Sequence, residues 1–102
     1  MFEYKGKQYE LKFNLKRIKL VENYSKMPTV ADIVMTNGAL SISAIETYFG
    51  FCLKEVGSDE FVSRKEGAEI AEAMIESEGY LKINNMLIQK MSEDIPFLFQ
   101  GA

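Results

Sequence analysis

Apolar and polar residues alternate at the start of the chain, in the stretch FEYKGKQYELKF. A period of two predicts β-strands, and the glycine of Lys5-Gly6-Lys7 can supply the left-handed conformation of a tight turn. The apolar residues on one side of the two strands are Phe2, Tyr4, Tyr9, Leu11 and Phe13. Residues 1–13 are therefore predicted to form a β-hairpin that packs against other elements, because an isolated hairpin is only marginally stable.

A period near 3.6 residues replaces this alternation from residue 14 onward and predicts helices. Asn14 is expected to cap a first helix, which the Met-Pro pair at 27–28 ends. Thr29 is expected to cap a short second helix, which ends at the Asn-Gly pair at 37–38. These breaks place two helices before residue 40.

A third predicted helix begins at Ser41 or Ser43 and continues to about Val56. It is apolar around most of its circumference, so we expect it to lie at the centre of the fold. Gly50 lies inside this helix, where it indicates either a close crossing with another helix or a tolerated defect.

Two more helices complete the pattern. Ser63 and Glu66 have the spacing of a capping box, Gly79 ends the helix that follows them, and Pro96 ends the last helix. The predicted fold is α+β and mostly helical, with an N-terminal hairpin followed by four to five packed helices. We expect one domain, made of the hairpin (1–13), a helical body (14–94) and a C-terminal tail (95–102).

The composition agrees with a small globular protein and argues against an enzyme. Of the 102 residues, 47% are hydrophobic and 26% are charged, as in an ordinary folded domain. The chain has one cysteine, Cys52, and no histidine, which removes the commonest general base and zinc ligand. We expect no catalytic residue, no metal and no cofactor. The lack of a disulfide pair, an export signal and a long apolar run predicts a cytoplasmic protein that does not enter a membrane.

Charge is distributed unevenly along the chain. Residues 1–26 carry seven basic and three acidic residues, a net charge of +4. Residues 27–102 carry five basic and twelve acidic residues, a net charge of -7, so the whole chain has a net charge of -3. The candidate charged contacts are Lys12, Lys16 and Lys19, and Glu69, Glu72 and Glu76 along one helix face. This asymmetry favours partner steering or head-to-tail self-association, and a solvated face is the plainest alternative. The acidic net charge argues against nucleic acid as the partner of the basic end.

Apolar residues near the C-terminus are the other candidates for a partner surface. Met91 fits the buried stripe of the last helix, whereas Met86 lies off it. Methionine adapts to varied apolar partners, so both are candidate contacts. Phe97, Leu98 and Phe99 follow Pro96, where they form either a tail folded back on the last helix or a binding segment.

The order of these elements resembles the tail assembly chaperones of long-tailed phages of Gram-positive bacteria and their prophages. The resemblance rests chiefly on GKQYELKFNLKRIKLVE, where the family often has a G-K-x-Y/F-x-L-x-F opening before a basic amphipathic helix. It implies a non-enzymatic helper that oligomerises and coats the tape-measure protein until tail-tube subunits replace it. Such a helper acts in the bacterial cytoplasm and is absent from the mature virion.

The resemblance also implies a coding-level reason for the C-terminal stretch PFLF. Many of these chaperones exist in a longer form made by a -1 ribosomal frameshift. Codons for Pro96, Phe97 and Leu98 can contain the slippery run T TTT TTA in the right frame, so the sequence permits a frameshift site there, and a short apolar tail folded back on the last helix is the alternative. The alternative function is a small helical binding or regulatory module that contacts nucleic acid through its basic N-terminal face.

Overall fold

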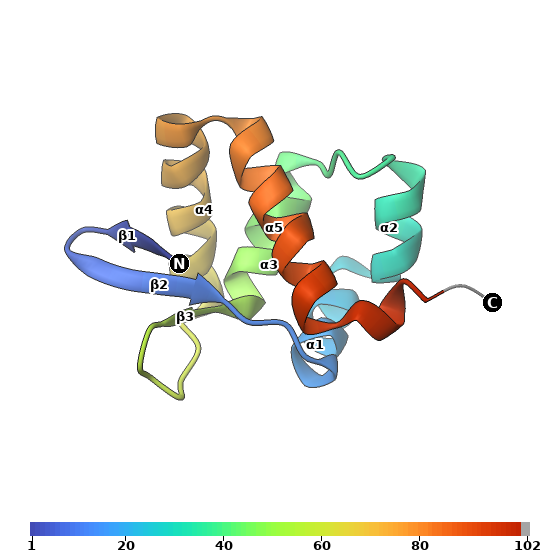
Figure 1. Ribbon diagram of the computed structural model, residues 1–102, viewed down its shortest axis with the longest axis horizontal. Helices are drawn as coiled ribbons and strands as arrows, with labels where there is room; N and C mark the ends of the chain where they lie inside the picture. The colour runs from blue at the N-terminus through green and yellow to red at the C-terminus, as the bar shows by residue number, and fades with distance from the viewer. Residues whose placement is uncertain (101–102) are drawn as a thin grey trace.

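The computed structural model describes residues 1–100 and shows a small antiparallel sheet beside a group of helices (Figure 1). The strands are β1 (Phe2–Tyr4), β2 (Lys7–Leu11) and β3 (Leu53–Glu55). The helices are α1 (Leu15–Ser25), α2 (Thr29–Met35), α3 (Ile42–Cys52), α4 (Arg64–Glu78), α5 (Tyr80–Asp94) and the 3-10 helix η1 (Pro96–Leu98). The predicted class, an α+β fold that is mostly helical, is confirmed.

The N-terminal hairpin forms as the alternating pattern predicts. β1 and β2 pair antiparallel, with Phe2 opposite Tyr9 and Tyr4 opposite Lys7. The two turn residues both have positive φ, 50° at Lys5 and 81° at Gly6. Positive φ at both central residues is the conformation that matches the twist of a two-residue hairpin, and glycine adopts it without steric cost.

A third strand was not predicted, because residues 53–56 were expected to continue the third helix. The helix ends at Cys52, and Leu53–Glu55 pair antiparallel with β2. The Lys12 amide also donates to the Cys52 carbonyl at 2.8 Å. β2 would otherwise have a free edge, so its unpaired backbone groups compete with the next helical turn for these residues. The partner strand is more than 40 residues away in sequence, beyond the reach of a local pattern.

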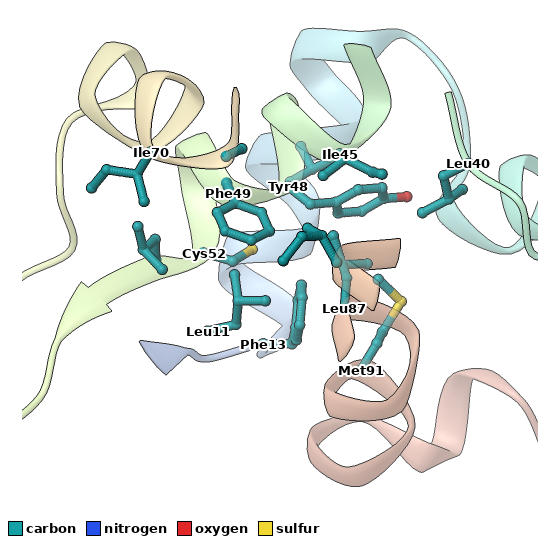
Figure 2. Packing of buried hydrophobic residues seen from close by; sticks show 14 of the residues in the cluster. Leu11, Phe13, Leu40, Ile45, Tyr48, Phe49, Cys52, Ile70, Leu87 and Met91 are labelled. Atoms are coloured by element: carbon teal, nitrogen blue, oxygen red, sulfur yellow. The ribbon is translucent and has the colours of Figure 1, made fainter. Parts of the chain in front are cut away.

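The core gathers around α3, as its apolar circumference predicts. Ile45, Phe49 and Cys52 on this helix are completely buried. Figure 2 shows Phe49 and Tyr48 of α3 facing Leu11 and Phe13 from the hairpin side, with side chains of α5 closing the other side. The hairpin is thereby stabilised by packing on helices rather than by its own turn.

The closest helix contact in the fold is the crossing of α3 and α4 at two glycines, Gly50 and Gly67. A Cβ atom on Gly67 would lie 2.7 Å from the Cα of Gly50 and closer still to the carbonyl oxygen of Phe49. A Cβ atom on Gly50 would lie 3.0 Å from the carbonyl oxygen of Arg64. Of the two alternatives for Gly50, the close crossing is confirmed.

Polar side chains of α5 fix the connections between elements. The Asp94 carboxylate is 8% exposed, accepts a hydrogen bond from the Phe13 amide at 2.9 Å and pairs with Lys90 at 3.3 Å. Asn84 is buried, accepts from the Leu40 amide at 3.1 Å and donates to the Gly38 carbonyl at 2.7 Å. Helix α5 therefore holds both the hairpin exit and the loop between α2 and α3.

We predict that Gly67→Ala lowers the free energy of unfolding by about 1–3 kcal/mol, because the added methyl group clashes with backbone atoms that cannot move aside. Alanine ordinarily gains ~1 kcal/mol over glycine inside a helix, so the sign of the change is diagnostic. Urea unfolding followed by circular dichroism measures it. Glu69→Ala, at an exposed site of the same helix, is the control and should change stability little. A Gly67→Ala protein as stable as the parent would contradict the crossing.

Candidate functional site

Metal-ligating and nucleophilic side chains of the described residues come first. Residues 1–100 contain no group of three or more Asp, Glu, Cys or His side chains placed to hold a metal ion. The thiol of Cys52 is completely buried, and desolvation raises its pKa to about 12. Desolvation likewise raises the pKa of the Tyr48 hydroxyl to about 12. Both groups stay protonated near neutral pH, so neither is an activated nucleophile.

The three predicted lysine contacts lie on the surface of the hairpin exit and α1. Lys12, Lys16 and Lys19 are exposed, and the ion pairs found among residues 1–100 include none of them. The neighbouring Arg17 is positioned differently, with its guanidinium 3.8 Å from the centre of the Phe61 ring. The lysines are therefore available to a partner, while the arginine contributes to packing through a cation–π contact.

The three predicted glutamates lie along the exposed side of α4. Glu69, together with Glu66, lines a hollow shared with Lys5 and Lys7 of the hairpin turn. These hairpin lysines thus lie beside negative charge of the same molecule. Glu72 and Glu76 are exposed, in none of the ion pairs found among residues 1–100, and do not line that hollow. They are the α4 carboxylates left most available to a partner.

The two methionine candidates lie in different environments. Met91 is completely buried in the core, as its place on the apolar stripe indicates, so it offers no surface in this conformation and leaves the set of proposed contacts. Met86 is partly buried and lines a hollow of about 160 Å³ between α5 and the hairpin, with Met1, Phe2 and Leu11. Glu10, Lys90 and Glu93 complete the lining of this hollow with charged groups.

The C-terminal segment is partly folded back and partly exposed. Ile95 is buried and Leu98 packs against the core, which anchors η1 to the helical body. Phe97 is 49% exposed and Phe99 is 40% exposed. Leu98 is thus chiefly an anchor, whereas the two phenylalanines face outward. Figure 1 shows this segment on the side of α5 away from the sheet, so it does not form one patch with the hollow beside Met86.

Sequence reasoning missed the exposed face of α2. Val34 is 66% exposed and Met35 is 71% exposed, and Val30 lies one helical turn before Val34 on the same side. The segment TVADIVM has apolar residues on every side of a short helix except at Asp32. A helix of this kind at the edge of a small fold cannot bury all of them, which is the signal that could have revealed the face.

Helix α2 is held by contacts that the sequence pattern does not show. Thr29 was expected to cap this helix, which is wrong, because Thr29 is its first helical residue. The N-cap position is taken by Pro28, whose side chain makes no capping hydrogen bond. The Thr29 amide instead donates a hydrogen bond to the Glu22 carboxylate of α1 at 2.7 Å. Asp32 of α2 is partly buried, and this desolvation raises the pKa of its carboxyl above the usual value.

The comparisons with known proteins add no relative. No family model matches the chain, and neither the search of curated proteins nor the search of solved structures found a match. Within residues 1–100, no helix combines the length and the apolar character needed to cross a bilayer.

We predict that Cys52 does not react with a thiol reagent in the folded protein at pH 8, because it is inaccessible and protonated. It should react fully in guanidinium chloride, which serves as the control. Its folded pKa lies above the unfolded value of about 9, so its stabilising contribution is present below pH 9 and is lost as pH rises toward 12. Rapid stoichiometric labelling of the native protein would contradict this burial.

Proposed function

We propose that this protein is a non-enzymatic phage tail assembly chaperone that binds the tape-measure protein and prevents its aggregation during tail assembly. The proposal needs no cofactor and places the protein in the bacterial cytoplasm, with release before the mature virion forms. It is supported by the sequence resemblance and by apolar side chains displayed on anchored elements. Tail-tube subunits would displace the chaperone, so its contacts with the tape-measure protein must be weak enough to exchange.

The observation that carries the proposal is the outward pair Phe97 and Phe99. Both belong to a segment that is fixed to the core through Ile95 and Leu98. Fixing the backbone lowers the entropy that a partner must remove when it binds. Aromatic rings bury a large area with few rotatable bonds, which suits recognition of an apolar helix face.

The hollow beside Met86 gives a second contact of the same kind. Its volume of about 160 Å³ has the size of one side chain, and its lining combines the apolar Met1, Phe2, Leu11 and Met86 with the charged Glu10, Lys90 and Glu93. Methionine side chains at its wall can adjust to side chains of different shape. This adaptability fits a partner that presents many non-identical apolar positions along a long helix.

The size of each contact agrees with exchangeable binding. Full burial of a phenylalanine side chain contributes roughly 1.5–3 kcal/mol. Phe97 and Phe99 are already about half buried, so each has about 1 kcal/mol left to contribute, or roughly a factor of five to ten in the dissociation constant. An oligomer of the chaperone bound along one tape-measure molecule would still cover it, because weak contacts of linked copies act together.

We predict that the double substitution Phe97→Ser and Phe99→Ser weakens tape-measure binding about 10- to 100-fold without changing the fold. The probe is the product of the long helical reading frame expected downstream of this gene. The soluble fraction of the tape-measure protein is measured after co-expression with each variant. The dissociation constant is measured by titrating each variant with purified helical segments of the tape-measure protein. Val56→Ser is the matched control, because it removes an exposed apolar side chain from the loop after β3.

Three results would overturn the proposal. The first is the absence of such a reading frame beside the gene. The second is a tape-measure protein that stays equally soluble with and without this chain. The third is salt-dependent DNA binding by Lys12, Lys16 and Lys19 without tape-measure binding, which would favour the nucleic-acid module instead.

A further inference from the structure

Strand β1 has one free backbone edge, because it lies at the margin of the sheet and pairs with β2 alone. Phe2 is opposite Tyr9, and Tyr4 is opposite Lys7. A two-residue hairpin turn is closed by a hydrogen-bonded pair, so Tyr4 directs its amide and carbonyl toward β2, and Phe2, two residues away, does the same. Glu3 lies between them and therefore directs its amide and carbonyl away from the sheet.

Hydrogen bonds on the other side of β2 agree with this direction. The Gln8 carbonyl accepts from the Val56 amide at 2.9 Å, and the Lys12 amide donates to the Cys52 carbonyl at 2.8 Å. The even-numbered residues of this stretch thus face β3, and the odd-numbered ones, such as Tyr9, face β1. The register of the hairpin and the hydrogen bonds to β3 give the same alternation.

The opposite margin of the sheet is covered, whereas the β1 edge is open. At that margin Lys54 of β3 is bridged to Phe61, and the Leu53 carbonyl accepts from the Val62 amide at 2.9 Å. Outside the ladder of β1 and β2, no hydrogen bond found among residues 1–100 uses the backbone of Glu3, and this residue is exposed. An uncovered edge of this kind is a template for pairing with another strand.

A hollow lies near each end of this edge. Phe2 lines the hollow of about 160 Å³ beside Met86, and Tyr4 lines a second hollow of about 260 Å³ with Ile70 and Glu69 of α4. On an added strand, side chains two residues apart point to the same face of the sheet as Phe2 and Tyr4. Such a strand can therefore direct one side chain toward each hollow.

Charge at the centre of the edge selects the occupant. The ion pairs found among residues 1–100 include neither Glu3 nor Glu69. A side chain directly opposite Glu3 on an added strand would lie about 5 Å away, where an opposite charge stabilises the pairing and a like charge destabilises it. The edge thus favours a lysine or arginine that is flanked by apolar residues.

The same charge disfavours pairing with β1 of a second copy. A two-fold contact through the outward groups of Glu3 would place this glutamate opposite its own counterpart. A register shifted by two residues would bring Lys5 opposite Glu3, but Lys5 belongs to the turn, with a φ of 50°. The occupant that fits is a strand of another protein.

We propose that β1 docks an extended segment of another protein as a fourth, antiparallel strand, with a basic side chain opposite Glu3 and apolar side chains opposite Phe2 and Tyr4. Only an antiparallel partner can exchange both hydrogen bonds of Glu3 with a single residue. Main-chain bonds supply affinity in this mode of recognition, and the flanking hollows supply selectivity. The proposal does not rest on tape-measure binding, although the hollow beside Met86 is common to both.

Peptides test whether charge at Glu3 selects the partner. The probe is a fluorescently labelled peptide, STVKVTS, whose binding is measured by anisotropy. We expect Glu3→Lys to weaken binding about fivefold or more and to bind the peptide STVEVTS better than the parent does, because the pairing of charges is reversed. Glu60→Lys makes the same change in net charge at an exposed position between β3 and α4, so its affinity should stay within about twofold of the parent. Circular dichroism verifies that both variants are folded.

Backbone methylation tests whether the peptide adds as a strand. N-methylation of the peptide's lysine removes the amide that would donate to the Glu3 carbonyl, so it should abolish binding. N-methylation of the valine after it alters an amide that points away from β1, so this control should still bind. The Glu3 amide should also exchange with solvent more slowly once the peptide is bound, which hydrogen exchange followed by NMR measures.

Four outcomes would overturn the proposal. The first is a parent protein that does not bind STVKVTS at millimolar concentration. Equal loss with both methylated peptides would show that side chains alone hold the peptide. A Glu3 amide that becomes protected as the protein concentration rises, without peptide, would assign the edge to a second copy. Loss of peptide binding in Phe97→Ser/Phe99→Ser would assign the peptide to the C-terminal segment, which lies on the side of α5 away from the sheet (Figure 1).

Discussion

The crossing of α3 and α4 at Gly50 and Gly67 is the constraint on which the rest of the structure depends. Two backbones that approach this closely leave no room for a Cβ atom on either side. The close approach also brings the start of α4 near α1, where the Arg64 guanidinium lies 4.9 Å from the centre of the Tyr24 ring. Because α3 carries the completely buried Phe49 and Cys52, the position of α4 and the packing of the core are set together.

Three polar side chains hold the elements that this crossing does not position. Asp94 fixes the hairpin exit, Asn84 fixes the loop before α3, and Glu22 fixes the start of α2. Each accepts a hydrogen bond from a backbone amide that would otherwise lack a partner. Leaving such an amide unsatisfied in a buried place costs about 1–3 kcal/mol, so these side chains determine connectivity as much as the apolar core does.

The extent to which the sequence predicted the fold follows from how local each interaction is. The hairpin, the Asn14 cap and the Ser63 cap depend on residues within a few positions, and all three form. Strand β3 depends on a partner strand more than 40 residues away, and the Glu22 contact depends on how the chain turns between α1 and α2, so the local pattern assigned a longer helix and a Thr29 cap instead. Tertiary pairing overrode local preference in both places.

The candidate surfaces were harder to predict for a related reason. Exposure of an apolar residue depends on what the fold leaves uncovered. One periodic pattern therefore contains both the buried Met91 and the partly accessible Met86. Charge was more informative, because lysines and glutamates stay at the surface unless they are paired. Even so, the sequence could not show that Lys5 and Lys7 lie beside Glu66 and Glu69 of the same molecule.

The anchored C-terminal segment suits the proposed binding of another chain. If linked copies bind along one tape-measure molecule, every copy presents Phe97 and Phe99 in the same orientation, since η1 is anchored to its own core. A row of copies would then repeat one aromatic pair at regular intervals. A long helical partner with apolar positions spread along its length matches such a row better than it matches a single molecule. Each individual contact can remain weak because repetition supplies the affinity.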